Sequence, residues 1–311
     1  MTTAILTHPD CLNHVTPAGH PERVARLEAV LTRLKAPEFD VLQRVEAPLA
    51  EEAQVLRCHP QAYLEKVKSA LPASGSTALD ADTHLSPGSL NAALRGVGAN
   101  LKAVDMVLGG EVANAFAAVR PPGHHAETQT AMGFCLFGNV SIAAKYALDH
   151  HGLSRVAIMD FDVHHGNGTQ DLLWEEERIL FASTHQMPLY PGTGAAHETG
   201  AHGNVLNVPL PPMSGGRRFR EEMEGQVLPA LDAFKPELVL ISAGFDAHFA
   251  DPLAQLQWHE DDFAWATHRL CDIADAHAGG KVVSTLEGGY DLDALAASVA
   301  AHLTVLMERG A

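Results

Sequence analysis

Short apolar runs alternate with amphipathic segments along most of the chain. Runs of strand length lie at residues 4–7, 41–45, 115–119, 156–160, 179–183, 205–208, 238–242 and 282–285. Apolar positions at helical spacing lie at residues 24–34, 139–150, 219–234, 261–277 and 291–307, and a further helix is expected after Gly168. From residue 112 onward the order is mostly strand, loop and helix. This alternation predicts parallel strands in an α/β fold.

The first third of the chain is less regular. A serine-proline pair predicts a capped start for a helix at residues 86–109, and residues 49–70 suggest two short helices. Residues 8–20 and 79–85 are expected to form polar surface loops. No repeat, low-complexity tract or linker divides the sequence, so we expect one domain over residues 1–311.

The apolar run at residues 156–160 leads directly into the sequence D-F-D-V-H-H-G-N-G-T. Alternate side chains of an extended segment point the same way, so Asp160, Asp162 and His164 are expected to share one side. That arrangement can place carboxylates and an imidazole on one metal ion. The alternative is a polar strand exit with solvated acidic residues, and the neighbouring residues favour the metal.

Polar clusters follow four of the expected strands. They are R-P-P-G-H-H-A at 120–126, D-F-D-V-H-H-G at 160–166, S-A-G-F-D-A-H at 242–248 and S-T-L-E-G-G-Y-D at 284–291. In an open parallel sheet, ligands bind beyond the carboxyl ends of the strands. The sequence therefore predicts that the chemically active residues gather at one edge of the sheet.

Three of these clusters offer further candidate groups. The adjacent imidazoles of His124 and His125 can serve as general base and acid, although loop histidines are more often structural. Asp246 alone would more often cap a loop, but in the same site it completes an Asp, His, Asp set with an open position, as catalytic zinc requires. Tyr290 either packs or hydrogen-bonds a developing oxyanion.

Composition narrows the class of protein. The chain has 311 residues, 46% of them hydrophobic, and a net charge of −17 from 38 acidic and 21 basic residues. This charge disfavours nucleic-acid binding. The four cysteines never form C-x-x-C, so we expect reduced thiols rather than a zinc ribbon or redox pair. Because signal-peptide features and an apolar run of about 20 residues are missing, we expect a cytoplasmic protein that does not bind membranes.

Taken together, the motifs resemble those of the zinc-dependent histone deacetylase family, including its class II-like bacterial amidohydrolases and the acetylpolyamine amidohydrolases. The matching segments are, in family order, G-H-P-E-R-V-A-R, R-P-P-G-H-H-A, G-F-C, D-F-D-V-H-H-G-N-G-T, S-T-H with Y-P-G-T-G, A-G-F-D-A-H and E-G-G-Y. The resemblance covers essentially the whole chain. It implies the arginase-deacetylase fold, with a parallel sheet of about eight strands between helical layers.

The resemblance also implies which metal ions the protein binds and which residues hold them. One zinc ion per chain would be held by Asp162, His164 and Asp246, although two carboxylates and one imidazole would also accept ferrous iron. A structural potassium ion would lie nearby, partly on backbone carbonyls of Asp160, Asp162, His164, Ser183 and Thr184.

Catalytic roles follow from the same resemblance. His124 and His125 would be the tandem pair beside the metal, with Asp160 orienting His124. Tyr290 would stabilise the oxyanion. Asn167 stands behind the second histidine, where some members have Asp, and should leave His125 less readily protonated. Which histidine is the general base stays open, because coupled imidazoles titrate as a pair.

Other positions are assigned to substrate by resemblance. Phe134 and Tyr190 would line an acyl-lysine tunnel, Asp82 would sit at its rim, and Arg26 resembles the arginine of an internal acetate channel. Leu253 stands where polyamine-selective relatives have an acid. Leu there favours acylated lysine in peptides or proteins, and small acetylated amines are the alternative substrate.

Two other classes fit less well. A binuclear manganese ureohydrolase would need Asp at Gly166, and a non-catalytic acyl-lysine or metal-binding module would be expected to lack a ligand or the tyrosine. The sequence therefore favours an enzyme, which could also form homo-oligomers.

Overall fold

An eight-stranded sheet forms the centre of the computed structural model, which describes residues 2–311. Its strands are β1 (Thr3–Thr7), β2 (Gln43–Glu46), β5 (Asn114–Ala117), β6 (Val156–Asp160), β7 (Ile179–Gln186), β8 (Val205–Leu210), β9 (Leu238–Ala243) and β10 (Val282–Leu286). They lie in the order β2-β1-β5-β10-β9-β6-β7-β8, and every neighbouring pair is parallel. The predicted parallel α/β fold is confirmed.

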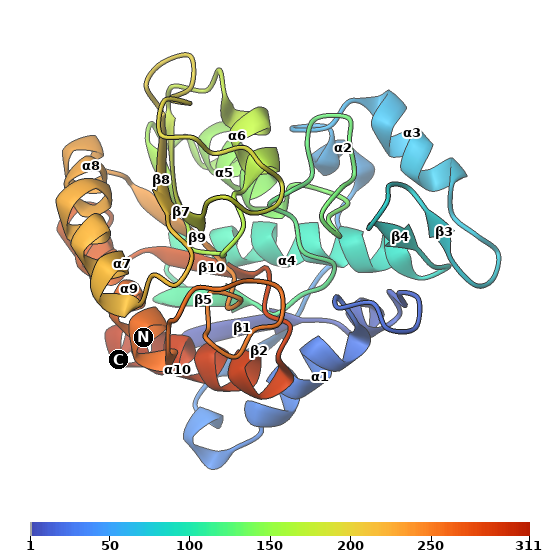
Figure 1. The fold of residues 1–311 in the computed structure, drawn as a ribbon, viewed down its shortest axis with the longest axis horizontal. Coiled ribbons are helices and arrows are strands. Elements are labelled where there is room, and N and C mark those ends of the chain that lie inside the picture. Colours follow the sequence, from blue (N-terminus) through green and yellow to red (C-terminus); the bar gives the residue numbers. More distant parts are fainter. Residues whose placement is uncertain (1) are drawn as a thin grey trace.

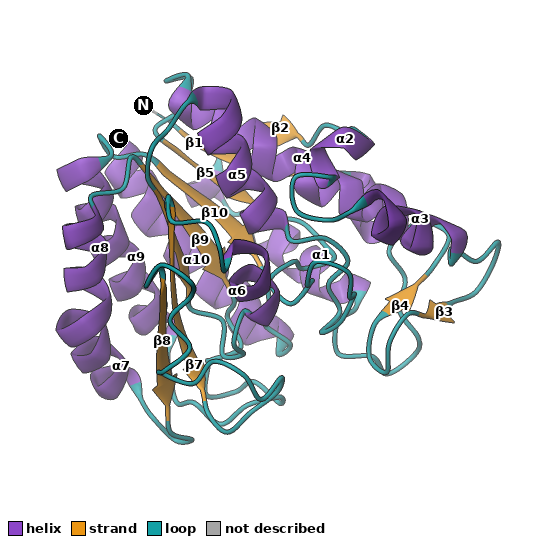
Figure 2. Ribbon diagram, turned by 90° about the horizontal axis from the view of Figure 1, so that it is seen from above, coloured by secondary structure: helices purple, strands orange, loops and turns teal. Residues whose placement is uncertain are grey.

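Helices cover both faces of the sheet (Figure 1). One face carries α4 (Ser89–Leu108), α5 (Asn139–His151) and α6 (Asn167–Leu173), and the other carries α1 (Val24–Arg33), α9 (Glu260–His277) and α10 (Leu292–Gly310). The shorter helices are α2 (Glu52–Val55), α3 (Gln61–Ser69), α7 (Gly216–Glu222) and α8 (Leu228–Phe234). An antiparallel hairpin of β3 (Thr77–Ala78) and β4 (His84–Leu85) lies with α3 away from the sheet (Figure 2).

The central strands are apolar because both of their faces are covered. Every residue of β6, β9 and β10 is buried, whereas the edge strand β2 is polar and largely exposed. The two ends of the chain lie side by side (Figure 1), since the Thr3 hydroxyl and the Asn114 amide both donate to the carbonyl of Leu306, at 3.1 and 2.8 Å. The last helix also belongs to the hydrophobic core, to which it contributes Leu303 and Leu306.

Three local predictions were wrong. The helix predicted to begin at the capping serine-proline pair of residues 86–87 begins at Ser89, with Gly88 as its N-cap and no side-chain cap hydrogen bond. Residues 79–85 are not simply a surface loop, because β4 forms there and Thr83 is fully buried. The helix expected at residues 219–234 is interrupted by a π-helical turn at Met223–Val227. Pro229 accounts for the interruption, since its ring lacks an N–H and clashes with the carbonyl four residues earlier in a regular α-helix.

The polar stretch at residues 8–20 also contains a short 3₁₀ helix at Pro9–Leu12, begun by the His8 imidazole, which accepts from the Asp10 N–H at 3.0 Å. All four cysteines are free and buried. Within residues 2–311, no helix combines the length and apolar character needed to cross a membrane.

Candidate active site

The four strands that end in polar clusters are neighbours in the middle of the sheet. Strands β5, β10, β9 and β6 follow one another directly in the strand order. Because they are parallel, their carboxyl ends meet at one edge, and the clusters that follow them converge there.

Asp162, His164 and Asp246 form the centre of this site. Each offers one ligand atom, and these atoms lie within 4.8 Å of one another. The Nδ1 atom of His164 is 3.1 Å from Asp162 Oδ1 and 3.1 Å from Asp246 Oδ2. All three side chains are buried. The sequence prediction that these residues lie together thus agrees with their positions.

The route by which they converge differs from the expected one. Strand β6 ends at Asp160, so simple alternation does not continue to His164. Instead the segment curls around its own carboxylates: the Asp162 N–H donates to Asp160 Oδ1 at 3.0 Å and the His164 N–H to Asp162 Oδ1 at 2.9 Å. The Val163 N–H donates to Asp246 Oδ1 at 2.9 Å. These bonds orient the carboxylates of the three aspartates.

The donor set fits a divalent metal ion. Two adjacent buried carboxylates repel each other and are costly to bury without a cation. Burial by itself lowers the pKa of His164, but Asp162 and Asp246 outweigh it and raise that pKa to about 10, so the carboxylates attract positive charge strongly. A Cβ atom at Gly288 would collide with the Asp246 carboxylate, which explains why glycine stands there. Two oxygens and one nitrogen are ligands that zinc accepts, with a position left for substrate.

The two histidines of the tandem pair have different partners. His124 Nδ1 lies 2.9 Å from Asp160 Oδ2, and His125 Nδ1 lies 2.7 Å from Asn167 Oδ1. Burial, with His124 and His164 nearby, holds the pKa of His125 well below its usual range. Burial also opposes charge on His124, but the Asp162 and Asp160 carboxylates outweigh it and raise its pKa. The neighbouring carboxylates thus favour a positive charge on His124, whereas the surroundings of His125 favour its neutral form.

Sequence reasoning missed the carboxylate behind Asn167. The Asn167 amide Nδ2 donates to Glu127 Oε1 at 2.8 Å, so its carbonyl oxygen faces His125. That oxygen can only accept, so it fixes the proton of His125 on Nδ1 and leaves the lone pair on Nε2. Glu127 directly follows the R-P-P-G-H-H-A motif, yet its partner lies far away in the sequence.

A second carboxylate that the sequence did not assign is Glu287. Its Oε2 accepts from the backbone N–H groups of Gly123 and His124, at 2.7 and 3.1 Å, and its Oε1 from the Ser242 hydroxyl at 3.2 Å. Burial raises the pKa of Glu287 to about 7. Three of the four converging segments are therefore joined by one buried side chain.

Tyr290 is held at the site by its backbone and by Arg26. Its N–H donates to Asp251 Oδ2 at 2.7 Å, and the Arg26 guanidinium lies 4.8 Å from its ring centre. Arg26 is buried, pairs with Glu22 and donates to the carbonyls of the loop before Tyr290. Burial raises the phenol pKa well above 10, although Arg26 opposes the shift. The phenol therefore stays protonated and can donate.

A cavity of about 200 Å³ leads to these groups. Its lining includes four residues that the sequence assigned to substrate, namely Asp82, Phe134, Tyr190 and Leu253, whereas Arg26 lies outside it. The Phe134 ring lies edge-on to Tyr290 at 5.8 Å, and the Tyr190 ring edge-on to His125 at 5.2 Å. The Asp82 carboxylate accepts from the Gly133 N–H at 3.1 Å, which supports the loop that carries Phe134.

The residues assigned to potassium lie on the neighbouring strands β6 and β7 and in the turn that follows β6. Asp160 on β6 is paired in register with Ser183 on β7. The Ser183 hydroxyl is bonded to His185 Nδ1 at 2.9 Å, whereas the Thr184 hydroxyl is buried and has no hydrogen-bond partner within residues 2–311.

Comparison with known proteins identifies the class to which this fold and site belong. A family model described as histone deacetylase domain matches residues 20–306. The chain is 43% identical to a histone deacetylase-like amidohydrolase of Pseudomonas aeruginosa, over 88% of this chain and 73% of that protein. It is 46% identical to an uncharacterized protein of Synechocystis sp., over 98% of this chain and 99% of the other.

A solved structure gives the same result. The crystal structure of the HDA15 HD domain superposes with a TM-score of 0.94 and 34% sequence identity, over 99% of this chain and 88% of that one. The chain therefore belongs to the histone deacetylase family. It has the arginase-deacetylase fold and is a deacetylase-type hydrolase, as the motifs predicted.

Proposed function

We propose that this protein is a zinc-dependent amidohydrolase that removes acetyl or other acyl groups from the ε-amine of lysine in peptides or proteins. The observation that carries the proposal is the buried Asp162, His164 and Asp246 set at the end of an apolar cavity, flanked by two imidazoles and a phenol. When bound, zinc supplies Lewis-acid chemistry, which makes water a stronger nucleophile at neutral pH and polarises an amide carbonyl.

Proton transfer falls to the histidine pair. Because Asn167 holds the Nδ1 proton of His125, the Nε2 lone pair can take a proton from the attacking water and pass it to the leaving amine. The low pKa of His125 keeps this nitrogen free at neutral pH. We assign the general base to His125 and an electrostatic role to His124, because the Asp160 carboxylate at its Nδ1 favours a positive charge on that ring.

Tyr290 is the donor for the developing oxyanion. A buried phenol that stays protonated offers a fixed hydrogen bond without reorganisation when charge forms on the carbonyl oxygen. Arg26 and Asp251 contact the backbone of its loop, so they position the ring.

The lining of the cavity favours acylated lysine over a polyamine. Phe134, Leu189 and Leu253 present apolar surface that suits the aliphatic stem of lysine. Asp82 is the single carboxylate in this lining, and it already accepts from Gly133 and Thr83. We also propose that potassium binds near Asp160, Ser183 and Thr184, where the buried Thr184 hydroxyl lacks a partner.

The test is a comparison of kcat/KM for an acetyl-lysine peptide and for N-acetylputrescine with the zinc-loaded protein, each repeated with a chelator. We expect the peptide to be preferred and both activities to be abolished by the chelator. Preference for N-acetylputrescine would support the alternative substrate class with the same metal chemistry. Chelator-resistant hydrolysis would contradict the metal-dependent mechanism.

A further inference from the structure

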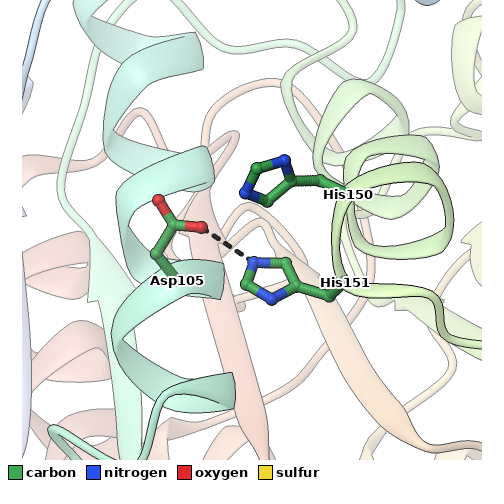
Figure 3. A group of neighbouring side chains, drawn as sticks. All are labelled: Asp105, His150 and His151. Atoms are coloured by element: carbon green, nitrogen blue, oxygen red, sulfur yellow. Dashed lines mark hydrogen bonds and ion pairs between the residues drawn. The ribbon is translucent and has the colours of Figure 1, made fainter.

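A second cluster of metal-ligand residue types lies on the helical layer, outside the active site. Asp105 projects from α4, and His150 and His151 are adjacent residues at the end of α5 (Figure 3). Their ligand atoms all lie within 4.8 Å of one another. Asp105 and His151 are partly exposed and His150 is exposed, so ions in solution can reach them.

A tyrosine on the same helix holds this cluster in place. The Tyr146 hydroxyl donates to Asp105 Oδ1 at 2.9 Å, and its ring is stacked on that of His150 with the centroids 4.7 Å apart. His151 Nε2 lies 2.8 Å from the same carboxylate oxygen. Carboxylates that bind metals are commonly hydrogen-bonded in this way, and the bond leaves their other oxygen free.

We propose that Asp105, His150 and His151 bind a divalent transition-metal ion such as zinc, nickel or cobalt. Two imidazoles and one carboxylate form a donor set that these ions prefer, and water would fill the remaining positions. Ligand atoms around such an ion lie roughly 3.5 Å apart, so small rotations of exposed side chains suffice to close the set. The metal would replace the proton that His151 shares with Asp105.

The site is separate from the catalytic one. Helix α5 begins at Asn139, behind the catalytic loops, and its 13 residues span about 20 Å. His151 is followed closely by Val156, where β6 begins, whereas the active site lies beyond the other end of β6. An ion here would join α4 to α5, the two long helices on one face of the sheet, and so act on stability rather than on hydrolysis.

The test is a calorimetric titration of the chelator-stripped protein with zinc alone. We expect two ions per chain for the unaltered protein and one for the double variant His150→Gln/His151→Gln. His268→Gln is the matched control, because His268 is a surface helix histidine that faces a single carboxylate, Glu308 at 3.9 Å. This control should still bind two.

A cobalt titration followed by visible absorption gives an independent readout. The second equivalent of cobalt should add visible absorption bands typical of cobalt with few ligands. We expect these bands in the unaltered protein and in His268→Gln, but not in the double variant. Melting curves in chelator verify that all three proteins are folded. One zinc ion per chain in the unaltered protein, or an unchanged second site in the folded double variant, would overturn the proposal.

Discussion

The two Asp-His clusters of this protein share their donor chemistry and differ in almost everything else. Asp162, His164 and Asp246 are buried, and backbone N–H groups hold their carboxylates. Asp105 and His151, by contrast, lie on the surface of two helices; the Tyr146 hydroxyl bonds Asp105, and Asp105 in turn bonds His151. The same ligand types therefore stand in very different surroundings in the two clusters.

Burial determines how strongly an ion bound at each cluster would act on its surroundings. In a site from which water is largely excluded, charge interacts strongly with substrate and with neighbouring imidazoles, so a metal there can drive a reaction. At the surface the same interactions are screened by water and salt. We expect the buried set to bind more tightly and to be required for hydrolysis, and the surface set to affect stability alone.

The largest effect should come from Asp246→Ala. Loss of one ligand removes the ion, and because the metal contributes several kcal/mol to the transition state, kcat/KM should fall by at least about 1000-fold. Metal analysis should show the catalytic equivalent missing while circular dichroism shows a folded chain. A variant that retained its full zinc content would remove Asp246 from the ligand set.

Tyr290→Phe should separate metal binding from catalysis. The variant keeps the ring that packs against Phe134 but loses the donor, so kcat should fall by about 100- to 1000-fold with KM and zinc content nearly unchanged. Steady-state kinetics alongside metal analysis provide the measurement. An unchanged kcat would exclude the phenol from the mechanism.

Glu127 should affect catalysis by orienting the Asn167 amide rather than by stabilising the fold. Glu127→Ala frees the Asn167 amide to turn over, so kcat should drop by about tenfold, a size usual for supporting residues around metal sites. Glu127→Gln is the conservative control, because its carbonyl oxygen can still accept from Asn167 Nδ2.

A spectroscopic readout distinguishes this positioning role from a structural one. In ¹⁵N NMR spectra, His125 should carry its proton on Nδ1 in the unaltered protein and in Glu127→Gln, and should populate both tautomers in Glu127→Ala. If all three proteins share one tautomer, Glu127 does not set the state of His125.

The smallest effect on activity should come from the surface cluster. His150→Gln/His151→Gln should keep kcat within about twofold, because the pair lies at the far end of α5 from the catalytic loops. The double variant should differ from the unaltered protein in how much zinc raises its melting temperature. At about 100 times the dissociation constant, zinc stabilises a single site by about 2.7 kcal/mol, a shift of a few degrees for a chain of this size. If zinc raised the melting temperature of the unaltered protein and of the double variant equally, the surface cluster would not be a zinc site.

Periodicity and strand-end position predicted the larger features. The apolar runs gave the eight parallel strands, and the polar residues directly after them identified the edge at which the site lies. Local conformation was harder to predict. The turn after Asp160 depends on bonds from backbone N–H groups to side-chain carboxylates, which strand periodicity does not reveal.

Residues that act through distant partners could not be predicted either. Glu127 and Glu287 contact groups far away in the sequence, so their roles appear only when the fold brings the segments together. Asp105 and the two histidines of the surface cluster lie on separate helices, and neither segment alone suggests a ligand set.

The most direct measurement is a zinc titration of the chelator-stripped protein with hydrolysis of an acetyl-lysine peptide followed at each addition. Activity should rise in proportion to zinc and reach its plateau at one equivalent per chain, while a further equivalent binds without changing the rate. Activity that first appears with the second equivalent, or none at any zinc level, would contradict the assignment of catalysis to the buried set.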